Sequence, residues 1–157
     1  MKKLLGVLGT VAFFAVVLIA GGIGKVGGRA AADAMMQPSK KEILDYAIKQ
    51  MEPKLPMMAD AETRMDRASS SSDGEILIYH YTLINWTASQ LSAADMQRMK
   101  ETVINQTCEN QDKTLLKNGI TLEFRYKSKD GSPVQDFRIA PKKCIFDPFA
   151  KRYGLAP

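Results

Sequence analysis

The sequence of 157 residues is poor in the residue types that carry most enzyme chemistry. It contains a single histidine, two cysteines and one tryptophan. It has no phosphate-binding loop, dinucleotide fingerprint, zinc-ligand pattern or calcium loop. These absences argue against the common metal- and nucleotide-dependent enzymes, and we expect neither a cofactor nor a bound metal.

Acidic residues are missing from the first 30 positions, although the chain as a whole has 22 Lys and Arg against 17 Asp and Glu, a net charge of +5. The four bases of that first stretch supply +4 of this charge. The remainder carries 18 bases against 17 acids, which is +1. A dedicated nucleic-acid binder needs a concentrated basic surface. Since residues 31–157 are nearly neutral, we predict no nucleic-acid partner.

Charge is also absent from Leu4–Ile23, a run of twenty residues preceded by Lys2 and Lys3. As a helix this run would be roughly 30 Å long, the thickness of a bilayer core. It exceeds the apolar core of a usual signal peptide, which favours an uncleaved, single-pass signal anchor in the inner membrane with an extracytoplasmic domain. The alternative is cleavage after Ala32 or Ala34, which would give a periplasmic or secreted protein. Both alternatives export the rest of the chain.

Small residues recur at four-residue spacing through Ala20, Gly24 and Gly28. Such a face lets two membrane helices approach closely and would support a homodimer. A flexible juxtamembrane stretch is the alternative interpretation.

The two cysteines, Cys108 and Cys144, both lie in the part predicted to be exported. An even pair in an exported domain predicts a disulfide. A metal site would need further ligands, and a redox pair is more typically a C-x-x-C motif.

Two helices are predicted. The first runs from about Lys40 to Met51, with Ser39 as its cap and one apolar face. The second begins near Ser92 and ends near Cys108. A short helical or turn segment, Asp112–Lys117, follows and ends at Asn-Gly.

Strands are predicted on either side of the second helix, at 63–69, 75–84, 120–127 and 134–139. The run Glu75–Ile84 is apolar on both faces, which predicts a central strand covered on both sides. The fold class is therefore α+β, an antiparallel sheet of about four strands with two helices packed on it. The expected organisation is an anchor or signal segment, a linker with the first helix, a disulfide-closed α+β domain and a tail, at 1–30, 31–54, 55–144 and 145–157. We expect the aromatic residues of the tail to dock on the core.

The stretch from Leu55 to Cys144 contains LPMMADAETRMD, then YHYTL, then Cys108, then LLKNGITLEFRYKSKDGSPVQDFRIAPKKC. With these features it resembles a group of small exported bacterial envelope proteins of unassigned function. The resemblance implies a disulfide-closed α+β domain and an envelope location, and it supplies no catalytic residues to transfer.

Candidate catalytic groups are few. His80 is the only side chain with an unperturbed pKa near neutrality, and it lies within a strand, where a histidine bonded to a neighbour is the default. The serine run Ser69–Ser72 predicts a loop, and it lacks the sequence of a nucleophile elbow. We expect a solvated surface rather than a catalytic pair of carboxylates at Asp60, Glu62 and Asp66. We therefore predict no enzyme.

Charge is unevenly divided along the chain after the first 30 residues. Residues 31–112 hold 8 bases and 13 acids, whereas residues 113–157 hold 10 bases and 4 acids. The second half predicts a basic surface at one end of the last hairpin that could bind an acidic partner, anionic lipid or a cell-wall polymer. The alternative is a solvated face that complements the acidic half. The basic residues are Arg125, Lys127, Lys129, Arg138, Lys142 and Lys143.

The sequence thus predicts a non-enzymatic, membrane-tethered extracytoplasmic binding or accessory protein of the bacterial envelope. Its partner would be a protein or another envelope component. The alternative is a cleaved, soluble exported inhibitor or immunity-type protein, and the mature N-terminus would separate the two.

Overall fold

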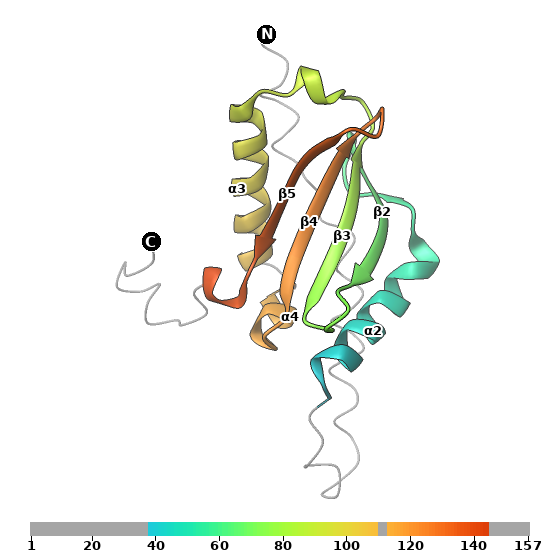
Figure 1. Ribbon diagram of the computed structural model, residues 1–157, viewed down its shortest axis with the longest axis vertical. Helices are drawn as coiled ribbons and strands as arrows, with labels where there is room; N and C mark the ends of the chain where they lie inside the picture. Colours follow the sequence, from blue (N-terminus) through green and yellow to red (C-terminus); the bar gives the residue numbers. More distant parts are fainter. Residues whose placement is uncertain (1–37, 110–112, 145–157) are drawn as a thin grey trace, which may run out of the picture.

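A computed structural model describes residues 38–109 and 113–144 of the chain. Its helices are α2 (Lys40–Met51), α3 (Ala93–Glu109) and α4 (Lys113–Lys117), and short 3-10 turns occur at Glu52–Lys54, Ala88–Gln90 and Pro141–Lys143. Its strands are β1 (Met57–Met58), β2 (Thr63–Ser70), β3 (Ile76–Leu83), β4 (Thr121–Ser128) and β5 (Pro133–Ile139). Figure 1 shows these elements forming the predicted α+β domain.

The strands form one sheet in the order β1-β2-β3-β4-β5, which makes β3 central as predicted. The expectation of a wholly antiparallel sheet of about four strands is wrong, because β1 adds a fifth strand and β3 pairs with β4 in parallel. The reason lies in the connection. A parallel neighbour requires a long crossover, usually helical, and α3 carries the chain back along the sheet so that β4 starts from the same end as β3 (Figure 1).

The two long helices begin where the sequence predicts. Ser39 caps α2 by accepting a hydrogen bond from the backbone N–H of Glu42, whose carboxylate accepts one from the Ser39 backbone N–H. Ser92 and Asp95 make the same reciprocal pair at the start of α3, with Asp in the place usually taken by Glu or Gln. Each pair satisfies amide groups that have no partner inside the helix, which fixes the helix start.

The core lies between one face of the sheet and the helices. Aromatic rings from neighbouring strands stack across it, with ring centroids 5.0 Å apart for Tyr81 and Tyr126 and 5.3 Å apart for Phe124 and Phe137. Tyr79 and Tyr81 are both buried within this core.

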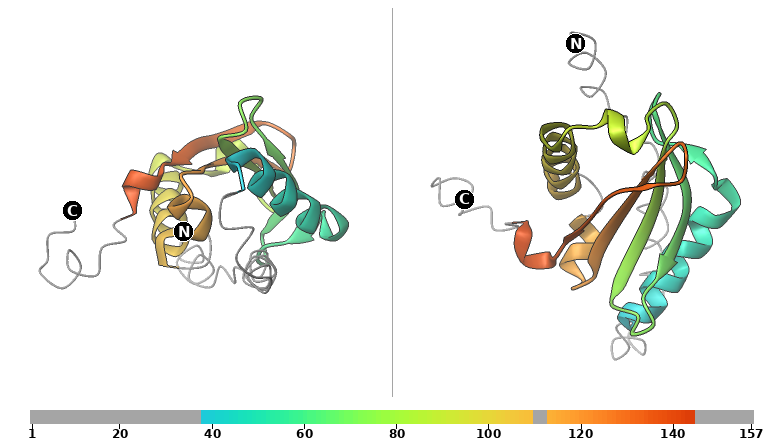
Figure 2. Two further views of the ribbon diagram at one scale, coloured as in Figure 1. Left: turned by 90° about the horizontal axis from the view of Figure 1, so that it is seen from below. Right: turned by 45° about the horizontal axis from the view of Figure 1, so that its top comes forward.

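The three helices of the described ranges cover the same face of the sheet. Buried residues of α2, α3 and α4 join one cluster that contains only the alternate strand positions, such as Leu77 and Leu122. α2 packs along β2, α3 along β5 and α4 against β4 (Figure 2). The second face of β3 is also buried, as predicted: Ile78 and Thr82 are 9% and 5% exposed. Within the described ranges its neighbours on that face are side chains of the adjoining strands and not a helix.

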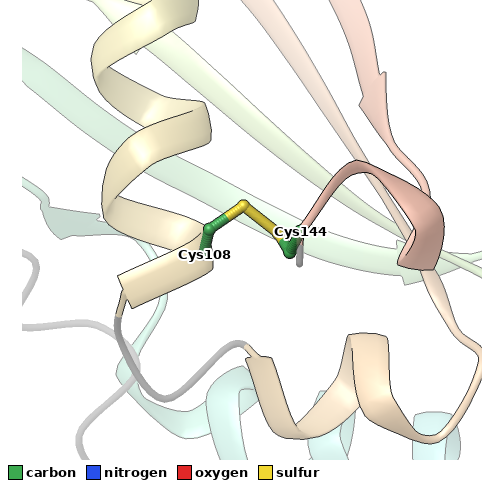
Figure 3. The surroundings of a disulfide bond; sticks show 2 residues. All are labelled: Cys108 and Cys144. Atoms are coloured by element: carbon green, nitrogen blue, oxygen red, sulfur yellow. A yellow bond between two sulfur atoms is a disulfide. The ribbon is translucent and has the colours of Figure 1, made fainter. Parts of the chain in front are cut away.

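The predicted disulfide is present between Cys108, in the last turn of α3, and Cys144, after β5 (Figure 3). The two Cα atoms are 5.3 Å apart, within the usual range for a disulfide. The bond joins two segments separated by 36 positions in the sequence, so it ties α3 to the end of the sheet that it covers.

Several predictions concern residues that the structure does not describe. The apolar segment Leu4–Ile23, the small residues Ala20, Gly24 and Gly28, and the tail 145–157 all lie outside the described ranges. Of the helices in residues 38–109 and 113–144, none has the length and apolar character needed to span a bilayer.

Candidate functional site

The second face of the sheet, which no helix of the described ranges covers, carries most of the charged strand residues. We call it the helix-free face and define it by the polar side chains of β2 to β5 that point away from the core: Arg64, Asp66, Arg67, Ser69, His80, Thr82, Glu123, Arg125, Lys127, Asp136 and Arg138. Strand alternation explains the β4 residues of this set, because successive side chains point to opposite faces.

A β-bulge brings an additional cation to this face. The register between β2 and β3 shifts between Met65 and Arg67. A bulge inserts an extra residue into one strand and so changes which residues share a face. Met65 therefore lies in the core, while both Asp66 and Arg67 lie on the helix-free face, Arg67 opposite His80.

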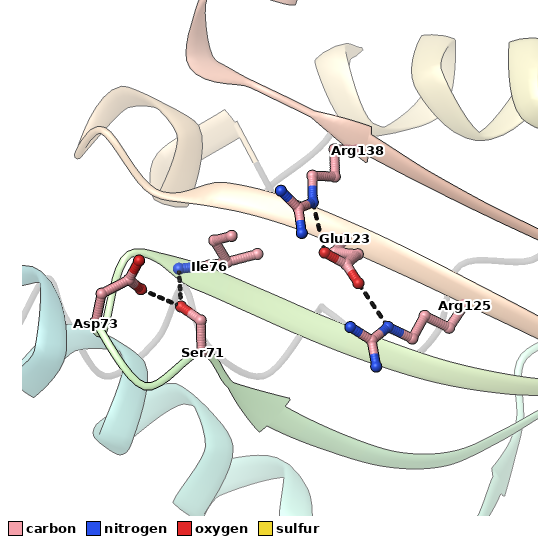
Figure 4. A network of polar contacts seen from close by, with 6 residues as sticks. All are labelled: Ser71, Asp73, Ile76, Glu123, Arg125 and Arg138. Atoms are coloured by element: carbon pink, nitrogen blue, oxygen red, sulfur yellow. Dashed lines mark hydrogen bonds and ion pairs between the residues drawn. The ribbon is translucent and has the colours of Figure 1, made fainter.

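Glu123 is the most buried charged group of the face, with only 5% of its side chain exposed. Its two carboxylate oxygens accept separate hydrogen bonds, 2.5 Å from Nε of Arg125 and 2.6 Å from Nε of Arg138 (Figure 4). Burial acts to raise the pKa of Glu123, but the hydrogen bonds and positive charges of the two arginines outweigh it and hold that pKa below its usual value. Glu123 is thus a carboxylate at neutral pH and orients two guanidinium groups.

Asp66 of β2 repeats this arrangement on the same face, two strands away from Glu123 of β4. Its carboxylate oxygens lie 2.7 Å from Nε of Arg64, 3.2 Å from Nζ of Lys127 and 2.5 Å from the hydroxyl oxygen of Thr82. Burial again raises the pKa of Asp66, and the hydrogen bonds from Thr82, Arg64 and Lys127 lower it by more. The face therefore contains two inward carboxylates, each held between two cations.

His80 lies between these two clusters, half-buried, with Nε2 3.1 Å from Oγ of Ser69. The prediction of a histidine bonded to a neighbour is confirmed. Burial lowers the pKa of His80, and the charges of Arg67 and Arg125 lower it further, against the opposing influence of Asp136 and Glu123. His80 is therefore neutral at pH 7.

The Ser69–His80 contact has the composition of a nucleophile and a base but lacks the rest of a catalytic arrangement. A base in such a pair is usually oriented by a third group that accepts a hydrogen bond from its other nitrogen. Within the described part of the chain, no carboxylate accepts a hydrogen bond from His80. The flanking arginines also reduce its basicity. In the same ranges, no group of three His, Cys, Asp or Glu side chains is placed to hold a metal ion.

The six cations predicted to form one basic surface are divided by the fold. Arg125, Lys127 and Arg138 lie on the helix-free face, each paired with a carboxylate. Lys129 is exposed in the turn between β4 and β5. Lys142 and Lys143 are exposed beyond the other end of β5, so the six do not gather at one end.

Sequence reasoning missed the contribution of β2. Arg64 and Arg67 belong to the acidic half of the chain, so a count of charge by halves hides them. The alternation of charged and apolar residues in TRMDRAS was the available signal. It could not reveal the bulge, which depends on pairing with β3.

Comparisons with known proteins show the fold. No protein-family model matches the chain, and no curated protein matches it significantly. Three solved structures are similar. A protein described as secreted, from Pseudomonas aeruginosa, has a TM-score of 0.58 and 18% identity, and the match covers 68% of this chain and 93% of that one.

The other two structures are pilotins of type 2 secretion systems. EpsS from Vibrio vulnificus has a TM-score of 0.57 and 16% identity, with 69% of this chain and 94% of that chain covered. AspS from Vibrio cholerae has a TM-score of 0.54 and 13% identity, with 67% and 92% covered. At such low identity the likeness shows a shared fold, in agreement with the α+β expectation.

Proposed function

We propose that this chain is a non-enzymatic, extracytoplasmic accessory protein of the bacterial envelope that binds a protein subunit of an envelope assembly. In this proposal the segment Leu4–Ile23 tethers it to the inner membrane, and the helix-free face is its binding surface.

The observation that carries the proposal is the construction of the helix-free face. Two of its three acidic groups, Glu123 and Asp66, are turned inward, and its cations are partly exposed across neighbouring strands. A surface of this kind can recognise a partner through charge and hydrogen bonds without reacting with it. The weakly basic His80 and the missing orienting carboxylate in the described ranges favour binding over catalysis there.

Two further observations support an envelope location. The disulfide Cys108–Cys144 is of the kind that persists in oxidising compartments outside the cytoplasm. The fold is also shared with a secreted protein and with two pilotins of type 2 secretion systems. An accessory role in an envelope assembly is the simplest function that agrees with both the disulfide and the shared fold.

A photo-crosslinking amino acid placed on the helix-free face tests the proposal in living cells of the native host. Thr121 is a suitable position, because it lies on this face in register with Ile76, is partly exposed and carries none of the charges. The matched control is Glu101, exposed on α3 on the opposite side of the sheet. We expect Thr121 to give one discrete adduct with an envelope protein identified by mass spectrometry, and Glu101 to give none.

Two results would contradict the proposal. One is recovery of the chain in the cytoplasm with its cysteines reduced. The other is an adduct of equal yield from both positions. The mature N-terminus, read from the same cells, distinguishes the tethered form from a cleaved, soluble inhibitor: an intact Met1 in the membrane fraction supports the tether, and a start at Asp33 or Met35 supports the cleaved form.

A further inference from the structure

The helix-free face separates its charges by depth. The side chains of Glu123 and Asp66 are 5% and 17% exposed, whereas those of Arg125 and Arg138 are 43% and 61% exposed. These two carboxylates lie beneath the cations, which form the outer layer of the face. The third acid, Asp136, is exposed and lies opposite Arg125. With five cations against three acids, the face still presents net positive charge outward.

The arginines contact their carboxylates in a way that leaves most of their donors available. Arg64, Arg125 and Arg138 each donate through Nε. A guanidinium has five N–H donors in a fixed plane, and within the described part of the chain no hydrogen bond engages the four on the terminal nitrogens of these residues. The buried carboxylates thus hold three guanidinium groups in place before any partner arrives, which reduces the entropy lost on binding.

The sheet register arranges cations along a line that crosses the strands. Arg67, His80 and Arg125 are successive partners on β2, β3 and β4. Neighbouring strands are about 4.8 Å apart, which places the Cα atoms of the two arginines about 10 Å apart with a neutral histidine between them. Arg67 is exposed, and no ion pair engages it within the described ranges.

We propose that this row, with the terminal nitrogens of Arg64 and Arg138 beside it, binds an extended acidic segment of a partner protein through the segment's carboxylates. The inference rests on the proposed function and names the chemistry of the partner. Guanidinium groups match carboxylates in planar, two-point contacts. An extended peptide that presents carboxylates every second residue, about 6.8 Å apart, can span the row.

The charge pattern favours an acidic peptide over a lipid surface. The face holds five cations, namely Arg64, Arg67, Arg125, Lys127 and Arg138, against Asp66, Glu123 and Asp136, so its net charge is +2. Binding to anionic membranes relies on clusters of about 4–8 largely unpaired basic residues. A line of cations interrupted by carboxylates instead favours a partner whose charges have matching positions and disfavours one whose charges do not. A folded or extended protein segment can hold its charges in such fixed positions.

The test uses the purified full-length chain in detergent and a fluorescent peptide with alternating serine and glutamate. The control peptide has glutamine in place of each glutamate. Fluorescence anisotropy should detect binding of the glutamate peptide at low salt, loss of binding at high salt, and no binding of the glutamine peptide.

The matched variants are Arg67→Gln and Lys49→Gln, since Lys49 is exposed on α2 away from this face and the charge change is the same. We expect Arg67→Gln to weaken the affinity for the glutamate peptide about threefold, which corresponds to the loss of one exposed ion pair. Lys49→Gln should leave this affinity unchanged. Arg67→Glu should weaken it further.

Three results would overturn the inference: no binding of the glutamate peptide at low salt, equal affinity for both peptides, or equal weakening by both variants. Circular dichroism of each variant confirms that it is folded. Failure here is distinct from failure of the proposed function, because a Thr121 adduct with an envelope protein would still stand if the acidic peptide did not bind.

Discussion

Replacing Glu123 by glutamine is the sharpest test of how the helix-free face is built. Glutamine keeps the size of the side chain but has one acceptor oxygen instead of two. One arginine Nε–H can still donate to that oxygen, while the other meets the amide N–H₂ and loses its acceptor. The substitution therefore removes both ion pairs and one hydrogen bond.

The expected loss follows from the exposure of the partners. Hydrogen bonds to charged groups contribute about 1.5–3 kcal/mol, and exposed ion pairs about 0.2–1 kcal/mol. Glu123 is buried, but Arg125 and Arg138 are 43% and 61% exposed and regain water when the pair is broken. We therefore expect Glu123→Gln to lower the free energy of unfolding by about 1–2 kcal/mol at pH 7.

The effect should depend on pH in a defined direction. The pKa of Glu123 is lowered in the folded state from its usual 4.5. The stability that its charge contributes is therefore fully present above the unfolded pKa and is lost as the pH falls through the folded pKa. Protonated Glu123 resembles glutamine, so the gap between wild type and Glu123→Gln should narrow below about pH 4.5.

Urea unfolding followed by circular dichroism, at neutral and acidic pH, measures both quantities. The control is Glu101→Gln, on the exposed surface of α3, where glutamine can still accept the hydrogen bond from Gln97. This control should stay close to wild type at every pH. An unchanged midpoint for Glu123→Gln at pH 7, or a gap that persists undiminished at acidic pH, would refute the account of the buried carboxylate.

Three further predictions concern the stability of the fold. Replacing Cys108 and Cys144 by alanine opens a loop of 36 positions and should lower the free energy of unfolding by about 3–4 kcal/mol in the chain-entropy model, measured by urea unfolding under oxidising conditions. In the same assay, Gly74→Ala should lower the free energy of unfolding more than Gly131→Ala. Both glycines have positive φ, 69° and 84°, but only at Gly74 would the new Cβ meet a neighbour, 3.0 Å from a side-chain carbon of α2. Phe124→Ala should lower stability by about 3–5 kcal/mol, because the ring is fully buried among stacked aromatic rings, and a loss under 1 kcal/mol would argue against that packing.

Local signals in the sequence predict most of the elements. The Ser39 cap and the apolar spacing of α2 depend on residues a few positions apart, so the predicted helix and the observed one coincide. Alternation in β4 likewise identifies its buried face. The disulfide follows from cysteine number and the expected compartment.

Features that depend on contacts between distant segments are harder to predict. The parallel pairing of β3 with β4 is decided by where α3 returns the chain, and no local pattern records that. The apolar run of β3 predicted that both faces are buried, but it did not reveal that residues of β2 and β4, Ser69 and Glu123, flank Ile78 on the second face. The bulge that brings Arg67 beside His80 arises only when β2 pairs with β3.

The central claim is that the helix-free face holds a partner through its outward cations. The most direct test is to measure how much of the envelope protein crosslinked from Thr121 is recovered from cells that carry Arg67→Glu, with Lys49→Glu as the matched control. The account predicts that Arg67→Glu greatly reduces recovery while Lys49→Glu leaves it at the wild-type amount, with both variants folded and exported. Equal recovery from the two variants would contradict it.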